Sequence, residues 1–216
     1  MNPYALVHRI IVAALTGTLP DEYRDESVNI LTQALNAPDD EVRALAVMGL
    51  GELGAAPAVL PALSSAMHDG CIQVRRRAAR SLGDLGNAAL PSLPHLVAAL
   101  DDSSISIRLE AMSAIGCIGP DAEPAVPHLM SLLADEQIRV RTVAGATLKR
   151  IGRSCIPFLV EALTNPDALI RERAALLLGQ LHATDDCVIE GLLEALADYD
   201  DDVRDAARKA LQLIEV

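Results

Sequence analysis

The sequence predicts an all-α protein, a right-handed α–α superhelix (solenoid) of about six stacked helix pairs with an extra capping helix at the N-terminus. Three observations support this fold class. The 216 residues are 51% hydrophobic but only 2% aromatic, so the core must be aliphatic, and this composition favours helix over strand. A Val/Ile-Arg pair recurs at nearly constant intervals, and the apolar residues around each pair follow the period of a helix.

The recurring pair sets the length of the repeat, because successive pairs are 32, 33, 33, 30 and 33 residues apart. In the first unit Ala46 and Leu50 lie four and eight residues after Val42, and alanine and a leucine or isoleucine hold these places in every unit. Residues spaced in this way share one face of a helix, so each unit contains a helix with one apolar face. The pairs are Val42-Arg43, Val74-Arg75, Ile107-Arg108, Val140-Arg141, Ile170-Arg171 and Val203-Arg204.

In chain order, residues 1–24 are predicted as an N-terminal helix, at about residues 3–16, and a linker. Each later unit is predicted as helix A, a short acidic turn, helix B and a glycine stop. Helix A begins at a proline in the middle units, as is typical of a first helical turn (Pro61, Pro94, Pro127 and Pro157). The units span about residues 25–54, 57–86, 90–119, 123–152, 153–182 and 186–216.

One connection between units is short. The segment "GRSCIP" between the fourth and fifth units has three residues fewer than "GPDAEPAVP" before it. We expect the stacking of the repeats to change at this point, in a direction that the sequence leaves open.

The segment "GLGELG" at residues 49–54 matches the glycine pattern of a dinucleotide-binding loop. Such a loop follows a strand and opens a helix, whereas the residues before Gly49 have helical periodicity. Related segments recur, as "SLGDLG" ending at Gly86 and "AIGCIG" ending at Gly119. The glycines are therefore predicted to close helices, the last in a left-handed cap and the inner one where a neighbouring backbone comes close.

These units resemble the HEAT repeat family, through the motifs Pro-x-Leu, Leu-x-Asp, Val-Arg-x-x-Ala and Leu-Gly-x-Leu-Gly, over about residues 25–216. The short unit looks most like the subclass of bilin lyase subunits and related bacterial scaffold proteins. The resemblance implies a non-enzymatic scaffold or adaptor that binds proteins. It also leaves open an alternative, a bilin lyase-like or chromophore-handling protein of the phycobilisome type.

In HEAT arrays the arginine of each pair contacts an acid of a turn, and partly buried charges are normally paired. We therefore expect a structural arginine ladder here, in preference to an anion-binding stripe. Its members are Arg43, Arg75, Arg108, Arg141, Arg171 and Arg204, with the acids Asp69, Asp102, Asp135 and Asp198.

The partner-binding surface is expected on the concave face, which the B helices line in such solenoids. On a helical wheel, the positions opposite the buried arc hold several arginines and apolar residues although the net charge is −12. This face is therefore predicted to bind an acidic, partly apolar protein segment. The candidate residues are Met48, Arg76, Arg77, Arg80, Leu109, Arg139, Leu169 and Leu176.

Other functions are disfavoured. The acidic charge repels nucleic acid, and no apolar run is long enough to span a membrane. Four cysteines without metal-binding spacing fit packed free thiols in the cytoplasm. His95 and His128, which take equivalent places on helix A, lack further ligands for a metal, and the acidic run at residues 198–202 lacks the pattern of a calcium loop. No catalytic motif is present, so we expect neither an enzyme nor a cofactor.

Overall fold

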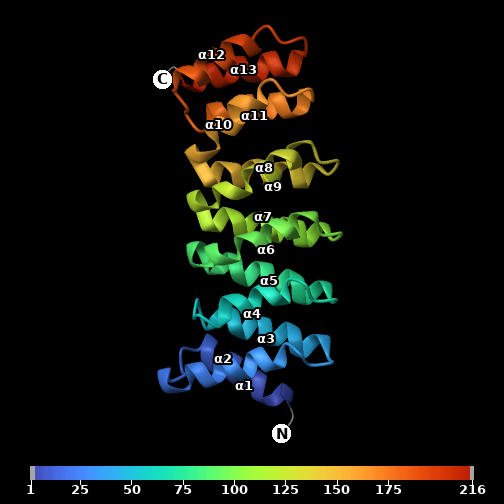
Figure 1. Ribbon diagram of the computed structural model, residues 1–216, viewed down its shortest axis with the longest axis vertical. Coiled ribbons are helices and arrows are strands. Elements are labelled where there is room, and N and C mark those ends of the chain that lie inside the picture. Colours follow the sequence, from blue (N-terminus) through green and yellow to red (C-terminus); the bar gives the residue numbers. More distant parts are fainter. Residues whose placement is uncertain (1–2, 215–216) are drawn as a thin grey trace. The chain divides into compact units, whose positions relative to one another are not determined.

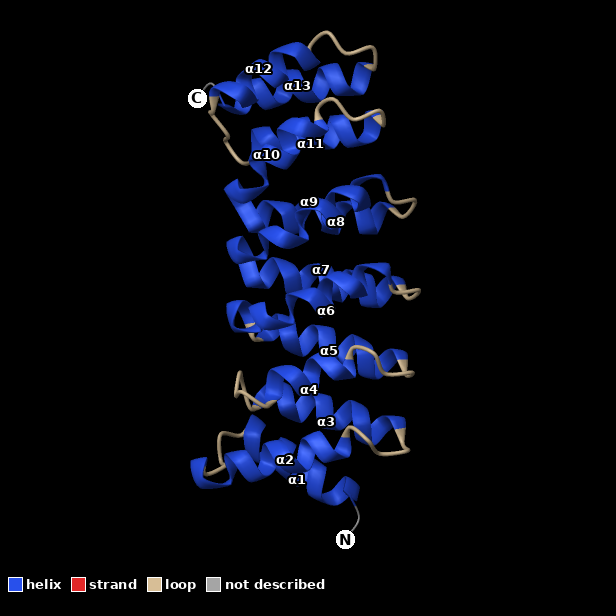
Figure 2. Cartoon of the chain, in the orientation of Figure 1, coloured by secondary structure: helices blue, strands red, loops and turns tan. Residues whose placement is uncertain are grey.

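The computed structural model describes residues 3–214, in which helices and short 3₁₀ segments are joined by turns and no strand is present (Figure 2). The all-α prediction is therefore confirmed. The chain divides into two compact units, Met1–Ile118 and Gly119–Val216. Each unit consists of successive helix pairs (Figure 1). Within a pair we call the first helix A and the second helix B.

Unit 1 begins with α1 (Pro3–Leu15), which packs on the first helix pair. Three pairs follow: α2 (Arg24–Ala34) with α3 (Asp40–Glu52), α4 (Val59–Ala66) with α5 (Ile72–Asp84), and α6 (Leu93–Ala98) with α7 (Ile105–Ile118). Unit 2 contains α8 (Val126–Ser131) with α9 (Ile138–Ile151), α10 (Ile156–Ala162) with α11 (Ala168–Gln180), and α12 (Asp186–Ala195) with α13 (Asp201–Ile214).

The A helices of the third and fourth pairs, α6 and α8, are only six residues long. Each follows a 3₁₀ segment, Gly86–Ser92 and Gly119–Ala125, which the sequence pattern did not predict. Both segments contain a proline, Pro91 and Pro124, which has no N–H to donate to a carbonyl of the preceding turn. The α-helix therefore begins only after the proline.

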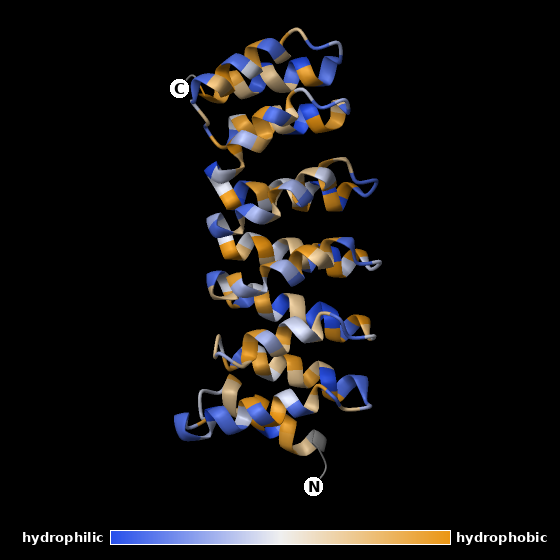
Figure 3. Ribbon diagram, in the orientation of Figure 1, coloured by the Kyte–Doolittle hydropathy of each residue, from blue (hydrophilic) through white to orange (hydrophobic). Residues whose placement is uncertain are grey.

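The core of both units is aliphatic. Val42, Ala46 and Leu50 of the first B helix are all at most 2% exposed, and the equivalent residues of other B helices are similarly buried, except that Leu211 of the last one is half-buried. Figure 3 shows apolar and polar residues alternating around the helices, as expected for helices that bury one face. We call the Val or Ile of each Val/Ile-Arg pair the anchor of its repeat. One anchor differs from the rest, because Ile170 is only half-buried.

The glycines close the B helices as predicted. Gly54 and Gly152 have φ angles of +77° and +82°, in the left-handed region that favours glycine, and His182, with a φ of +47°, takes the same place in the fifth pair. The inner glycines mark close approaches between B helices. A Cβ on Gly179 would lie 2.6 Å from Cα of Ala210 on the next B helix, which no side chain there can accommodate.

In three repeats the arginine of the Val/Ile-Arg pair, Arg43, Arg75 or Arg171, connects its own turn to the next repeat. In Arg75, Nη1 donates to the carbonyl oxygens of Asp69 and Gly70 at 2.8 and 3.2 Å, while Nε donates to the carboxylate of Asp102 at 2.8 Å. Nε of Arg43 contacts Asp69 in the same way, at 2.7 Å. These hydrogen bonds hold one repeat on the next in addition to the apolar contacts.

The most buried of these pairs joins Arg171 and Asp198, whose side chains are 4% and 10% exposed. Two hydrogen bonds of 2.7 and 2.8 Å link them, and the Tyr199 ring lies 4.5 Å from the guanidinium carbon. The hydrogen bonds from Arg171 hold the pKa of Asp198 below its ordinary value. Arg43 lowers the pKa of Asp69 by the same means.

The remaining ladder arginines also contact their own turns. Arg108 donates to the carbonyl oxygen of Asp102 at 3.1 Å, and Arg204 donates to that of Asp198 at 2.6 Å and pairs with Asp201. Arg141 donates to the carbonyl oxygen of Asp135 at 2.7 Å. Its Nε is buried without a hydrogen-bond partner among the described residues, unlike Nε of the other arginines that reach a turn aspartate.

The sequence of the next repeat explains why Nε of Arg141 has no hydrogen-bond partner among the described residues. Asn165 stands in the turn where other repeats have aspartate, and its Oδ1 accepts the N–H two residues ahead at 2.9 Å, just as Asp102 does at 2.8 Å. The amide carries no charge with which to pair Arg141. At this point, next to the short connection "GRSCIP", α9 and α11 contact each other much less than α11 and α13 do.

Candidate functional site

The candidate protein-binding surface of unit 1 lies where α3, α5 and α7 pack side by side. These helices enclose a hollow of about 660 Å³. Four of the predicted residues line it: Met48 from α3, and Arg76, Arg77 and Arg80 from α5. Met48 is half-buried, while Arg76 and Arg80 are exposed. The structure thus brings together a cluster that the helical wheel only placed on one face.

The three arginines of this hollow differ in how they are held. Nη1 of Arg77 donates to the carbonyl oxygen of Ala44 on α3 at 3.3 Å, which fixes this side chain across two helices. Arg76 and Arg80 make no hydrogen bond or ion pair with any residue that the structure describes. Their guanidinium groups therefore remain available to a ligand, one helical turn apart on α5.

Three acids around the same hollow were missed by the sequence analysis: Glu52, Asp84 and Glu110. They balance the three arginines in formal charge, so the hollow is less basic than the predicted face. A signal for them exists in the repeat pattern. Glu52 and Asp84 both stand ten residues after the Val of their repeats, and Glu110 stands three residues after its Ile, the same place that Arg77 of the predicted set takes in its own repeat.

The other predicted surface residues do not join this hollow. Leu109 on α7 is half-buried outside it. In unit 2, Arg139 of α9 is exposed and Leu169 of α11 is half-buried. Leu176 of α11 lines a second hollow, of about 310 Å³, between α9 and α11. The predicted set is therefore divided between the units.

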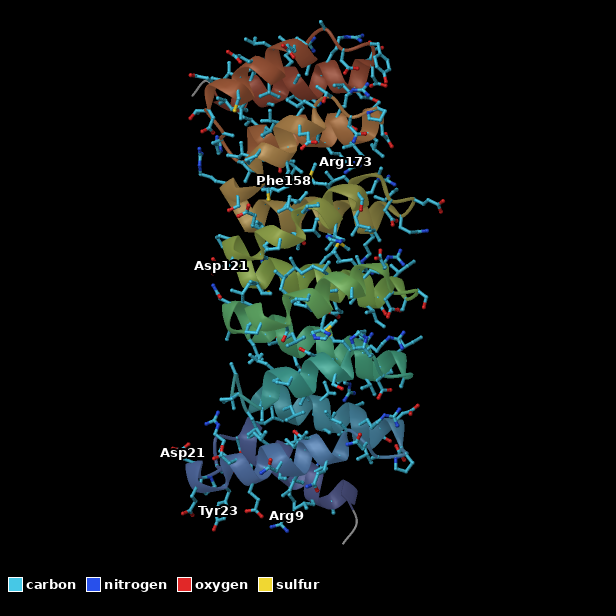
Figure 4. The ribbon with its side chains drawn as sticks, in the orientation of Figure 1. Arg9, Asp21, Tyr23, Asp121, Phe158 and Arg173 are labelled. Carbon is cyan, nitrogen blue, oxygen red and sulfur yellow. The ribbon has the colours of Figure 1, made fainter. Side chains whose placement is uncertain are left out.

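A third hollow, of about 520 Å³, lies on the side of the A helices between the fourth and fifth pairs. Phe158 of α10, labelled in Figure 4, lines it together with Pro127 and Met130 of α8. The boundary between the fourth and fifth helix pairs therefore has one hollow on the side of the A helices and another on the side of the B helices.

The polar groups considered for metal binding or redox chemistry have other surroundings. His95 contacts His68, with 3.1 Å between Nδ1 and Nε2, a contact that the sequence analysis did not foresee. No group of three or more His, Cys, Asp or Glu residues in the described chain is arranged to hold a metal ion. The cysteines form no disulfide, and burial, with a smaller effect of Glu123, raises the pKa of Cys155 to about 12. No described helix is long and apolar enough to cross a bilayer.

Comparisons with solved structures show the same architecture over most of the chain. An archaeal HEAT-like repeats protein from Thermococcus onnurineus matches with 16% identity and a TM-score of 0.57, covering 100% of this chain and 97% of that one. A chain of the CpcE and CpcF complex of phycocyanin lyase from Nostoc matches with 22% identity and a TM-score of 0.50, covering 100% and 94%. A designed armadillo repeat protein matches with 19% identity and a TM-score of 0.53, covering 85% of this chain and 98% of that one.

A comparison with curated proteins gave no significant match. The family model for HEAT repeats, by contrast, matches residues 28–116, 61–149 and 126–212. These ranges include the turns, the arginines and the glycine stops described above. The chain therefore belongs to the HEAT repeat family.

Proposed function

We propose that this protein is a non-enzymatic binding scaffold and that the hollow over α3, α5 and α7 holds an acidic, partly apolar segment of a protein partner. The observation that carries the proposal is the pair of unpartnered guanidinium groups of Arg76 and Arg80 next to the half-buried Met48. Guanidinium binds carboxylate with two parallel hydrogen bonds, and the thioether adapts to apolar side chains of different shapes.

The spacing of the two arginines limits the segments that fit. Side chains four residues apart on a helix have Cβ atoms about 5–6 Å apart, so two carboxylates at a similar separation can be bound together. Glu52, Asp84 and Glu110 line the same hollow as the arginines and repel additional negative charge. The hollow should therefore select a segment with a few well-placed carboxylates between apolar residues, in preference to a long acidic tract.

The experiment is affinity capture from a lysate of the source organism, followed by mass spectrometry. Three baits are compared: the wild type, Arg76→Glu/Arg80→Glu, and the charge-matched control Arg9→Glu/Arg153→Glu, which alters exposed arginines that do not line the hollow. The proposal predicts a partner retained by the wild type and the control and lost by the first variant. Equal capture by all three baits would place binding elsewhere.

A second candidate function is handling of a bilin. It takes its support from the repeat subclass and from the similarity to a phycocyanin lyase complex, which at 22% identity reflects a shared fold. Co-expression with a bilin separates the two candidates. Visible absorbance that copurifies with the protein would favour pigment handling, and its absence together with a captured partner would favour the scaffold.

A further inference from the structure

The hollow of about 310 Å³ in unit 2 lies between the neighbouring B helices α9 and α11. Thr142, Gly145 and Lys149 line it from α9, and Arg173, Leu176 and Gln180 line it from α11. Arg141 of α9 reaches it as well. Figure 4 labels Arg173 in the space between the α8–α9 and α10–α11 pairs.

The sequence explains why this space is open. Gly145 stands five residues after the anchor of its repeat, where other B helices have the buried side chains of Val47, Ala79 and Met112. A Cβ on Gly145 would find its nearest neighbour, a methyl group of Leu177, at 3.9 Å. The missing side chain and the loose contact between α9 and α11 therefore leave room for a small ligand.

The lining of this hollow is cationic. Arg141, Lys149 and Arg173 contribute three positive charges, and no acidic residue lines the hollow. This contrasts with the hollow of unit 1, where three acids balance three arginines. A field of one sign in a concave site attracts and concentrates anions even when the whole protein is acidic.

Two arginines that line the hollow each have an unsatisfied hydrogen-bond donor. Nε of Arg141 and Nε of Arg173 are both buried without a partner among the described residues. Buried donors are nearly always hydrogen-bonded, because a desolvated and unpaired N–H is costly. Nη1 of Arg141 is fixed by the carbonyl oxygens of Asp135 and Glu136, at 2.7 and 3.1 Å, so its guanidinium is held in place beside the hollow.

We propose that the hollow between α9 and α11 is a binding site for an oxyanion, a carboxylate or a phosphate, which accepts hydrogen bonds from Arg141 and Arg173 and is neutralised further by Lys149. Arg141 lacks the carboxylate partner that Asp102 and Asp198 supply to other arginines of the ladder, because Asn165 stands in that place of the sequence. This inference is independent of the proposed function, because it concerns other helices in the other unit.

The test is titration of the ¹⁵N-labelled protein while the arginine Nε–H signals are recorded by NMR. The signals of the two residues are assigned by their loss in Arg141→Lys and Arg173→Lys. One arm adds inorganic phosphate and the other adds a short peptide with a single glutamate side chain and blocked termini, both at constant ionic strength set with chloride. Saturable shifts of both signals are expected, and the arm in which they occur at lower concentration identifies phosphate or carboxylate as the source.

Variants make the test specific to the hollow. Arg173→Gln should weaken the binding by about tenfold and the exposed Lys149→Gln by about threefold, whereas Arg153→Gln, outside the hollow, should leave it unchanged. Asn165→Asp supplies an internal carboxylate for Arg141 and should weaken binding as well. Shifts that increase linearly without saturation in both arms, or binding that Lys149→Gln and Asn165→Asp leave unchanged, would overturn the proposal.

Discussion

The replacement Asp198→Ala tests whether the arginine ladder holds consecutive repeats together. It removes the two hydrogen bonds from Arg171, at 2.7 and 2.8 Å, and one from the N–H of Asp200 at 2.9 Å. The guanidinium, 4% exposed, loses its counter-charge but keeps the carbonyl oxygens of Asn165 and Pro166. Breaking a buried pair costs about 3–5 kcal/mol, and because acceptors remain we expect about 3 kcal/mol.

The free energy of unfolding is measured by chemical denaturation, and the melting temperature should fall by about 6–12 °C. The matched control is Asp185→Ala, which breaks another arginine–aspartate pair between repeats. Arg153 and Asp185 lie 3.0 Å apart but are 62% and 44% exposed, so the expected loss is below about 1 kcal/mol. Equal losses in the two variants would mean that burial has no influence on the strength of these pairs, contrary to this prediction.

Three further predictions follow from single groups. Gly179→Ala should destabilise the protein by about 1–3 kcal/mol through the clash with the next B helix, whereas Gly145→Ala should stabilise it by up to about 1 kcal/mol, as denaturation midpoints will show. The pKa of Asp198 is lower in the folded than in the unfolded state. Its contribution to the free energy of unfolding is therefore complete above the unfolded pKa and is lost as the pH falls below about 4. Because Asp198→Ala lacks this carboxylate, the variant should lose less stability than the wild type between neutral and acid pH. Cys155 should resist a thiol reagent at mildly alkaline pH in the native protein, while the exposed Cys187 reacts.

The fold was predictable because each repeat carries the same local signals. The apolar period around Val42 fixes a helix with one buried face, and a glycine such as Gly152 ends it in a conformation that other residues rarely adopt. The 3₁₀ segments Gly86–Ser92 and Gly119–Ala125 were not predicted, because a proline inside a connection restricts the backbone without specifying which helical form precedes it.

The candidate site was predictable only in part. A helical wheel places Arg76 and Arg80 on the face away from the core, but it treats one helix at a time. Glu110 reaches the same hollow from the neighbouring helix α7, and this depends on the distance and rotation between helices. In the same way, Asn165 is visible in the sequence as an exception, whereas its consequence for Arg141 appears only when α9 and α11 are placed side by side.

Photo-crosslinking from the lining of the unit 1 hollow shows directly whether this hollow holds a partner segment. A photoreactive phenylalanine analogue is introduced in place of Met48, and in a control in place of Leu193, an exposed apolar residue of α12. In lysate of the source organism, we expect an adduct from position 48 that is absent from position 193, and a crosslinked peptide that contains carboxylates and apolar residues. Adducts from both positions alike, or a crosslinked peptide that is basic, would contradict it.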